Sequence, residues 1–379
     1  MREIYLDNNA TTKIDEEVMS AMLPYLQSEF GNPSSLYSMG TKVKEEIDKS
    51  RKNVADLIGA QYDEIIFTSC ASESNVTAIM NAIRSDEKKR HIITTKVEHA
   101  SIMETMHYLE GKDYDVTYLN VDEKGSIDLT ELKTSIREDT VLIAVMMANN
   151  EIGNIYPVEE IGEIAKKHNI LFHVDAVQSV GKIKIDVKKI NCDTLSISAH
   201  KIHGPKGIGV LYVREGIPFI PLIFGHQESN RRGGTENTAY IIGLGVAARR
   251  IMEHMSEDNK RIRSLRDKLE DDIMSSLDGV LIYGDKNNRM PNTSSIAFRG
   301  VDANELMFML ESFNIYVSTG SACNSREAEP SHVLKAINAD LDNYSPMRVS
   351  LSEYTTEEEI NEFVKKVINI VTMLRHKNK

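Results

Sequence analysis

The amino-acid sequence predicts an α/β fold, in which a large domain with a mostly parallel sheet precedes a smaller α+β domain. Strand-like runs alternate with helical runs up to about residue 215, which is typical of a parallel sheet. The run 141–147 is apolar on both faces, as an interior parallel strand is. After about residue 260, short strands and helices follow in mixed order. We therefore expect a large domain of residues 13–259 and a small domain of residues 260–379, with residues 1–12 packed on the small one.

Turn formers and the spacing of apolar residues divide the first part of the chain into elements. Gly59 is a natural stop for the second helix, and the turn at Gly204–Gly207 separates two strands that read as a hairpin. We expect helices at 15–26, 40–58, 75–83 and 158–167, and strands at 64–68, 91–95, 116–119, 141–147, 170–174, 194–198 and 209–213.

The last part of the chain is divided in the same way. Two separate helices are expected before it, and the final helix opens at Thr355–Glu358 with a capping-box pattern. We expect helices at 241–255, 259–277, 302–313 and 331–337, and strands at 280–283, 294–298, 315–319 and 347–351.

The composition excludes several classes of function. The chain has 379 residues and a formal net charge of −12, so general binding to nucleic acids or to anionic membranes is not expected. Its three cysteines, Cys70, Cys192 and Cys323, are too few and too widely spaced for a disulfide framework or a zinc site. No apolar run has membrane-spanning length, and the start lacks the apolar core of a signal peptide. A reducing cytoplasm is the expected location, and no metal site is expected.

Polar residues follow several of the expected strands directly. In parallel α/β sheets, ligand-binding groups gather at the carboxyl ends of strands. We therefore expect one shared site for Ser72, His99, Asn150, Asp175, Gln178 and Lys201.

Two of these residues suggest a particular cofactor chemistry. Lys201, held by a glycine turn, is placed to form a Schiff base, although an ordinary solvated hairpin lysine would fit the same pattern. Asp175 closes an apolar strand, where a carboxylate is costly unless it meets a cation or caps a helix. Pyridoxal phosphate uses such a lysine, with an aspartate partner for its pyridinium nitrogen. The small-residue turn Ser69–Ser72 opens a helix, and fits either a phosphate site or a plain capping box.

Two candidate side chains lie in the second part. Cys323 stands among small residues in GSACNS (320–325), where an accessible thiol could act as a nucleophile. A buried, inert cysteine is the alternative. Arg348 lies in an alternating strand and is suited to bidentate binding of a carboxylate, or to a surface salt bridge.

These motifs, in this order and over essentially the whole chain, resemble the cysteine desulfurases of the NifS/IscS type. That family belongs to the class V branch of pyridoxal-phosphate enzymes with the aminotransferase fold, fold type I. The resemblance rests on YLDNNATT, NPSS, TSCASESN, VEHASI, NNEIG, HVDAVQSVGK, AHKIHGPKGIG, RRGGTENT, GSACNS and EPSHVLKAI.

The resemblance implies a role for each candidate residue. Lys201 would form the Schiff base with pyridoxal 5'-phosphate, Asp175 would pair with the ring nitrogen, Gln178 with the ring hydroxyl, and His99 would stack on the ring. Arg348 would bind the carboxylate of L-cysteine. The remaining cofactor contacts would come from Ala71, Ser72, Ser198 and His200 at the phosphate, from Asn150 beside the ring and substrate, and from Thr235 of a partner subunit.

The implied reaction converts L-cysteine to L-alanine. Cys323 would accept the sulfur as a persulfide, and would contact a nascent iron–sulfur cluster during transfer. The resemblance further implies a homodimer with shared sites, and a sulfur-acceptor protein that is either an iron–sulfur scaffold or an enzyme that thiolates tRNA or a cofactor. Direct contact with nucleic acid or membrane is not implied.

Some positions depart from the family pattern. Cys70 stands where glycine is usual, and Ser72 where threonine is commoner. Ser229–Asn230 lacks a usual basic side chain, and Ser352–Glu353 replaces a Gly-Arg pair. None of these changes removes a catalytic group, although the last two alter charge near the substrate entrance or a partner surface.

Two rival functions are open on the sequence. In a pyridoxal-phosphate lyase or transaminase, Cys323 would be a bystander and its replacement by alanine would leave activity intact. In a sulfur-relay scaffold, Lys201→Ala would leave the physiological function intact. The joint presence of Lys201, Asp175, His99, Arg348 and Cys323 argues against both.

Overall fold

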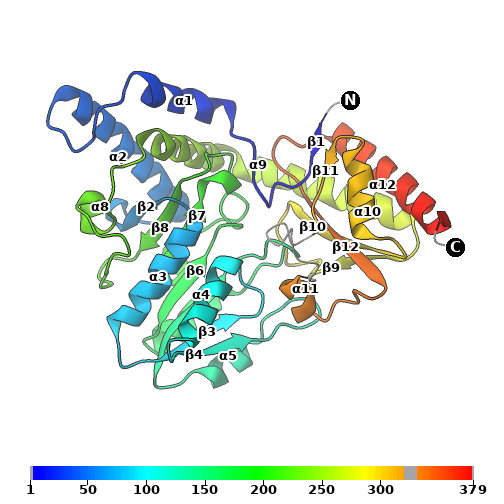
Figure 1. Ribbon diagram of the computed structural model, residues 1–379, viewed down its shortest axis with the longest axis horizontal. Helices are drawn as coiled ribbons and strands as arrows, with labels where there is room; N and C mark the ends of the chain where they lie inside the picture. Colours follow the sequence, from blue (N-terminus) through cyan, green and yellow to red (C-terminus); the bar gives the residue numbers. More distant parts are fainter. Residues whose placement is uncertain (1–2, 320–330, 378–379) are drawn as a thin grey trace.

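A computed structural model describes residues 3–319 and 331–377, and contains the α/β architecture that the sequence predicts (Figure 1). In the described residues the larger sheet has seven strands. Neighbouring strands from β7 through β6, β5 and β3 to β4 are parallel. The antiparallel strand β8 lies between β2 and β7 and forms the predicted hairpin with β7. The order is β2 (Ile65–Thr68), β8 (Gly209–Val213), β7 (Thr194–Ser198), β6 (Leu171–Asp175), β5 (Thr140–Met146), β3 (His91–Thr95) and β4 (Asp115–Leu119).

Helices cover both faces of this sheet, which explains why β5 is buried along its whole length. Ile143 and Val145 point into the main core, whereas Leu142 and Ala144 pack in a second core beneath α3 and α4. The covering helices are α2 (Ser38–Ile58), α3 (Ala71–Ser85), α4 (Ala100–Glu110), α5 (Leu129–Ser135), α6 (Val158–Lys167) and α7 (Val187–Ile190), whereas α1 (Glu16–Gln27) packs on the long helix α9 (Thr238–Ser276). Gly59 ends α2 in the left-handed conformation, as predicted.

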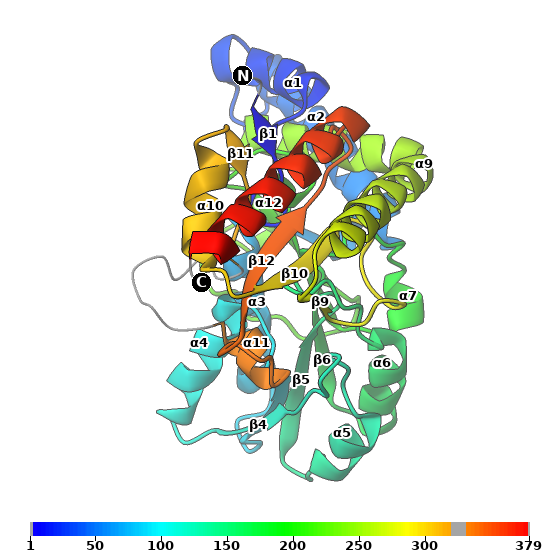
Figure 2. The same ribbon diagram turned by 90° about the vertical axis from the view of Figure 1, so that its right-hand side faces the viewer.

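A separate, smaller sheet is antiparallel, in the order β12 (Tyr344–Ser350), β10 (Thr293–Arg299) and β9 (Val280–Tyr283). Figure 2 shows α12 (Glu357–Lys377) lying obliquely over this sheet beside α10 (Ala303–Glu311). Near the chain start, β1 (Ile4–Tyr5) pairs in parallel with β11 (Ile315–Tyr316), and Ile4 and Leu6 join the same core as α12. The other short helices are η1 (Tyr62–Glu64), η2 (Ala199–Lys201), α8 (Gln227–Asn230) and α11 (His332–Ala336).

The structure differs from the sequence prediction at the long helix α9 (Thr238–Ser276), where two helices were expected. The apolar spacing breaks between the two predicted helices because α9 passes from one core to another: Ile251 packs in the main core and Ile262 in the core of the smaller sheet. The intervening polar residues include neither glycine nor proline, so the backbone continues as helix. The predicted strand 315–319 is also shorter, because only its first two residues pair with β1.

A membrane-spanning helix was not expected, and within residues 3–319 and 331–377 every helix is too short or too polar to cross a bilayer.

Candidate active site

Lys201 lies at the end of η2, which directly follows β7, so the chain turns at the carboxyl edge of the sheet. Its ammonium group donates hydrogen bonds to the backbone oxygens of Asn9 (2.5 Å) and Ala10 (2.7 Å). The chain continues into β8 through Gly207, whose φ of +88° favours glycine. The lysine is therefore held between the large sheet and the N-terminal segment.

Asp175 ends the neighbouring strand β6 and is buried. Its two oxygens accept hydrogen bonds from the Asn75 side chain (2.8 Å) and the Val177 backbone N–H (2.9 Å), which are neutral donors. Asn75 in turn accepts from His173 Nε2 (3.0 Å), whose other ring nitrogen contacts Thr194 Oγ1 (2.9 Å). Burial lowers the pKa of His173 to about 4, so the ring is neutral and orients Asn75 toward the carboxylate.

His99 caps the start of α4, with Nδ1 accepting from the Ser101 N–H (3.1 Å). Ser101 Oγ also accepts from Asn75 (2.9 Å), so one amide side chain links His99 to Asp175. Desolvation is the main effect that lowers the pKa of His99; the Asp175 charge raises it and the Lys201 charge lowers it, each by less. The imidazole is thus half-buried, neutral and close to both charged groups.

The turn between β2 and α3 keeps its backbone donors available. Ala71 and Ser72 are the first residues of α3, and their N–H groups bind no acceptor among residues 3–319 and 331–377. Cys70 occupies the cap position in an extended conformation and makes no side-chain cap, so cysteine in place of glycine causes no strain. A Cβ on Gly209 would lie 2.6 Å from the Cys70 carbonyl carbon, which shows how closely β8 approaches this turn. The turn therefore retains the donors of an anion site.

Ser198 and His200 lie at the carboxyl end of β7, next to Lys201. Ser198 is the last residue of β7 and is buried. The His200 ring contacts Thr11 Oγ1 (3.1 Å), and burial followed by the neighbouring Lys201 charge lowers the pKa of His200 to about 4. Both residues can therefore offer uncharged polar groups beside the lysine.

Gln178 has an unsatisfied buried acceptor. Its Nε2 donates to the Asn9 backbone oxygen (3.0 Å), but Oε1 has no hydrogen-bond partner in the described part of the chain. An orphaned buried acceptor is costly, so a ligand that donates a hydrogen bond would be stabilised there.

Arg348 lies on β12 and is buried, so the surface salt bridge that the sequence allowed is ruled out. Its guanidinium binds Asp7 Oδ1 (2.7 Å) and the backbone oxygen of Asn150 (3.2 Å). The Nε–H is buried and finds no acceptor within residues 3–319 and 331–377. The smaller sheet thus brings an arginine with a spare donor to Asn150, at the end of β5.

Two further predicted site residues are Cys323 and Thr235. Cys323 lies outside the described residues. Thr235 is exposed in the loop that precedes α9.

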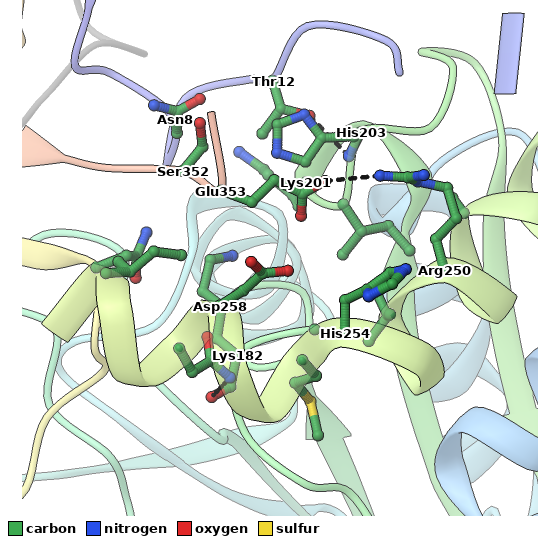
Figure 3. Close-up of a pocket in the computed structure, with 18 of the residues that line it drawn as sticks. Asn8, Thr12, Lys182, Lys201, His203, Arg250, His254, Asp258, Ser352 and Glu353 are labelled. Carbon is green, nitrogen blue, oxygen red and sulfur yellow. Dashed lines mark hydrogen bonds and ion pairs between the residues drawn. The ribbon is translucent and has the colours of Figure 1, made fainter. Parts of the chain in front are cut away.

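A cleft opens on the α9 side of Lys201 (Figure 3). Of the predicted site residues that the structure describes, Lys201 alone lines it. Figure 3 shows Lys182 and Asp258 facing one side of the cleft and His203 the other, with Arg250 paired to Glu353. Burial, and then Lys201, lower the pKa of Lys182 to about 7. Apart from Lys201, the predicted strand-end groups that the structure describes do not line this cleft, so it adjoins the candidate active site at the lysine alone.

Three residues that organise the site were not predicted from the sequence: Asn75, Asn9 and Asp7. Asn75 stands one helical turn after Ser72, so a polar residue on the sheet-facing side of α3 was the available signal. Asn9 and Asp7 belong to the YLDNNATT motif, for which the sequence suggested no role. Their contacts with Lys201, Gln178 and Arg348 depend on long-range folding, which local patterns do not reveal.

A lysine and a buried aspartate at neighbouring strand ends of such a sheet define the class of pyridoxal-phosphate enzymes with the aminotransferase fold. Comparison with known proteins agrees, because residues 4–363 match the aminotransferase class-V family. The chain belongs to this family, and within it to the cysteine desulfurases of the NifS/IscS type.

Three relatives illustrate the similarity. Cysteine desulfurase NifS of Azotobacter vinelandii is 45% identical over 379 residues, which cover 99% of this chain and 94% of that protein. A solved NifS-like protein is 40% identical with a TM-score of 0.92, and the match covers 98% of this chain and all of that one. SspA in complex with cysteine is 36% identical with a TM-score of 0.81, and the match covers 93% of this chain and 100% of that one.

The residues present fit pyridoxal phosphate, the cofactor of this family. The N–H groups of Ala71 and Ser72 suit its phosphate, and the buried Asp175 carboxylate suits its protonated ring nitrogen. The orphaned Gln178 Oε1 would accept from its ring hydroxyl.

Proposed function

We propose that this protein is a cysteine desulfurase, which converts L-cysteine to L-alanine and transfers the sulfur to Cys323 as a persulfide. One observation carries the proposal: Lys201 and Asp175, at strand ends of the large sheet, lie in the same region as Arg348 of the smaller sheet. The segment 7–9 joins Lys201 and Arg348, because Lys201 binds Asn9 and Arg348 binds Asp7. A cofactor amine, its nitrogen partner and a carboxylate-binding arginine are the groups that amino-acid chemistry requires.

The residues of the chain have separate tasks. Pyridoxal phosphate, when bound, withdraws electrons from the substrate Cα. Lys201 would anchor it through Nζ and then move a proton at the substrate, while Asp175 keeps the ring nitrogen protonated. His99, half-buried and neutral, would stack on the ring without adding charge.

Arg348 would orient the substrate through its carboxylate. The Nε–H donor, which has no acceptor within residues 3–319 and 331–377, supports this role, and Asp7 fixes the guanidinium plane. Ala71, Ser72, Ser198 and His200 would hold the cofactor phosphate, with Thr235 reaching from a partner subunit, and Asn150 would lie beside the ring.

The sulfur step belongs to Cys323. Its thiolate attacks the substrate sulfur, a new S–S bond forms, and the Cβ–S bond breaks. The electron pair of the broken bond stays with the substrate carbon, which takes up a proton and leaves as alanine.

The persulfide sulfur would supply iron–sulfur cluster assembly, with Cys323 in contact with the nascent cluster during delivery to a scaffold protein. Similarity to NifS and IscS supports this destination. An enzyme of tRNA or cofactor thiolation is the alternative acceptor. We place the homodimer in the cytoplasm, where a thiol nucleophile stays reduced.

Alanine and sulfide released from L-cysteine in the presence of a thiol reductant test this function. The proposal predicts equal amounts of both, and loss of both in Cys323→Ser. Cys192→Ala is the control, because that side chain is fully buried in the main core. Full activity of Cys323→Ser would favour a lyase or transaminase instead.

A further inference from the structure

A carboxylate lies inside the turn that would bind the cofactor phosphate. Glu73 stands in the first turn of α3, and its Oε2 accepts a hydrogen bond from the Ser69 N–H (2.8 Å). The side chain is only 10% exposed. The contact fixes the Ser69–Ser72 turn, but it places a negative charge beside the position of a phosphate dianion, where repulsion is strong because little water screens it.

Arg232 approaches this carboxylate from a different part of the chain. Its Nε donates to Glu73 Oε1 (3.0 Å) and its Nη2 to Oε2 (3.2 Å), which is a bidentate ion pair. Burial raises the pKa of Glu73, but the hydrogen bonds from Arg232 and Ser69 outweigh this effect and the pKa is lowered. Glu73 is therefore ionised, and Arg232 is the cation that balances it.

The loop that carries Arg232 is held rigidly. Glu228 forms a buried ion pair with Arg51 (2.7 Å at both oxygens) and accepts from the Phe67 N–H (2.9 Å) in β2. Glu228 and Ser229 have φ of 50° and 58°, a left-handed conformation that persists only where contacts enforce it. At the neck of the loop, a Cβ on Gly233 would lie 2.1 Å from the Phe224 backbone oxygen.

The Arg51–Glu228 pair also removes a second possible source of repulsion. Between the turn and the loop lies an open pocket, lined among others by Ser69, Glu228, Arg232 and Glu236. Because Arg51 neutralises Glu228, the charge of Arg232 remains directed at Glu73.

We propose that Arg232 is a positioning residue for the cofactor phosphate: it neutralises Glu73, so that this carboxylate can hold the phosphate turn without repelling the phosphate. The inference rests on the cofactor of the proposed function, and not on its sulfur chemistry.

The test compares binding of pyridoxal phosphate with binding of pyridoxal, which lacks the phosphate, to full-length protein stripped of cofactor. Absorbance titrations without L-cysteine give both affinities for Arg232→Gln, Glu73→Gln and the double variant. Arg137→Gln is the control, because Arg137 forms ion pairs with Asp115 and Asp139 at the surface.

The expected result is a suppression pattern. Arg232→Gln weakens pyridoxal phosphate binding about tenfold and leaves pyridoxal binding unchanged, because an unbalanced carboxylate then faces the phosphate. The double variant regains affinity to within about threefold of the wild type, since both charges are gone. Arg232→Lys, which keeps the charge, stays close to the wild type.

Two results would overturn the proposal. If the double variant binds as weakly as Arg232→Gln, Arg232 acts on the phosphate directly. If Arg232→Gln weakens both ligands equally, its role is confined to folding of the loop. Failure of the desulfurase reaction would leave these titrations unchanged, so the two proposals fail separately.

Discussion

At the scale of single residues, the chemistry of the site depends on which lysine forms the Schiff base with the cofactor. Lys201 and Lys182 both line the cleft of Figure 3, but only Lys201 follows a strand of the large sheet next to Asp175. The low pKa of Lys182, about 7, makes it a reactive amine as well, and therefore the natural competitor.

Borohydride reduction of the cofactor-loaded protein distinguishes these two lysines. We expect the reduced cofactor on the Lys201 peptide, found by peptide mass mapping. Lys182→Ala should keep this label and the yellow colour, whereas Lys201→Ala should lose both. A label on Lys182 in the wild-type protein would contradict the assignment.

A second residue-scale prediction concerns His173, which orients Asn75 and through it Asp175. Below pH 6.5 the unfolded chain protonates this histidine, whereas the folded chain resists protonation down to about pH 4. Folding stability is therefore lost as the pH falls through this window, by about 3 kcal/mol in total at 1.36 kcal/mol per pH unit.

Urea unfolding of the wild type and His173→Gln between pH 6.5 and 4 measures this loss. The variant should be less stable at pH 6.5, and the difference should shrink as the pH falls. His107→Gln, at an exposed histidine, should follow the wild type throughout. A difference that stays constant with pH would show that His173 has the same pKa in the folded protein as in the unfolded chain.

The sequence predicted the reacting side chains better than the residues that hold them in place through hydrogen bonds. Lys201, Asp175 and His99 were predictable because each directly follows a strand or opens a helix at the same sheet edge. The Asn75 relay and the Arg348–Asp7 pair were not, because hydrogen bonds between positions up to 341 residues apart leave no local pattern.

At the scale of elements, α9 is the feature that local patterns misjudged. The buried face of α9 changes midway along the helix, and this change in the apolar pattern predicted a break between two helices. The residues at that point nevertheless favour helix. The strands of the large sheet were predicted well, because burial on both faces gives continuous apolar runs.

We propose that the chain divides into two domains near residue 260, inside α9, with residues 1–12 belonging to the second. Glu270 on α9 forms a buried bidentate pair with Arg289 (2.7 and 2.5 Å), ahead of β10. Glu270→Ala should cost about 3–5 kcal/mol, because it leaves a buried arginine unpaired.

Hydrogen exchange shows where this destabilisation falls. Two domains predict faster exchange in β10 and β12 of the variant, with β5 and β6 unchanged. Lys268→Ala, which breaks a surface pair with Asp272, should have little effect. Equal acceleration in both sheets would indicate one cooperative unit.

At the scale of the whole molecule, we propose a homodimer with shared active sites, in which Thr235 acts on the partner's cofactor. Its exposure in the loop that precedes α9 is compatible with such a role.

Mixing two inactive variants tests this arrangement. Thr235→Asp should repel the phosphate, and Lys201→Ala removes the cofactor amine. If Thr235 acts across the interface, refolding the two together restores about a quarter of wild-type activity, because half of the dimers carry one intact site. If Thr235 acts within its own chain, mixing restores none.

The central claim is that sulfur from L-cysteine passes to Cys323 through chemistry that requires Lys201. Mass spectrometry of the purified protein after brief exposure to L-cysteine, without reductant, tests it most directly. The account predicts one or more extra sulfur atoms on the Cys323 peptide, absent from Lys201→Ala. Alanine release with no sulfur on that peptide would contradict it.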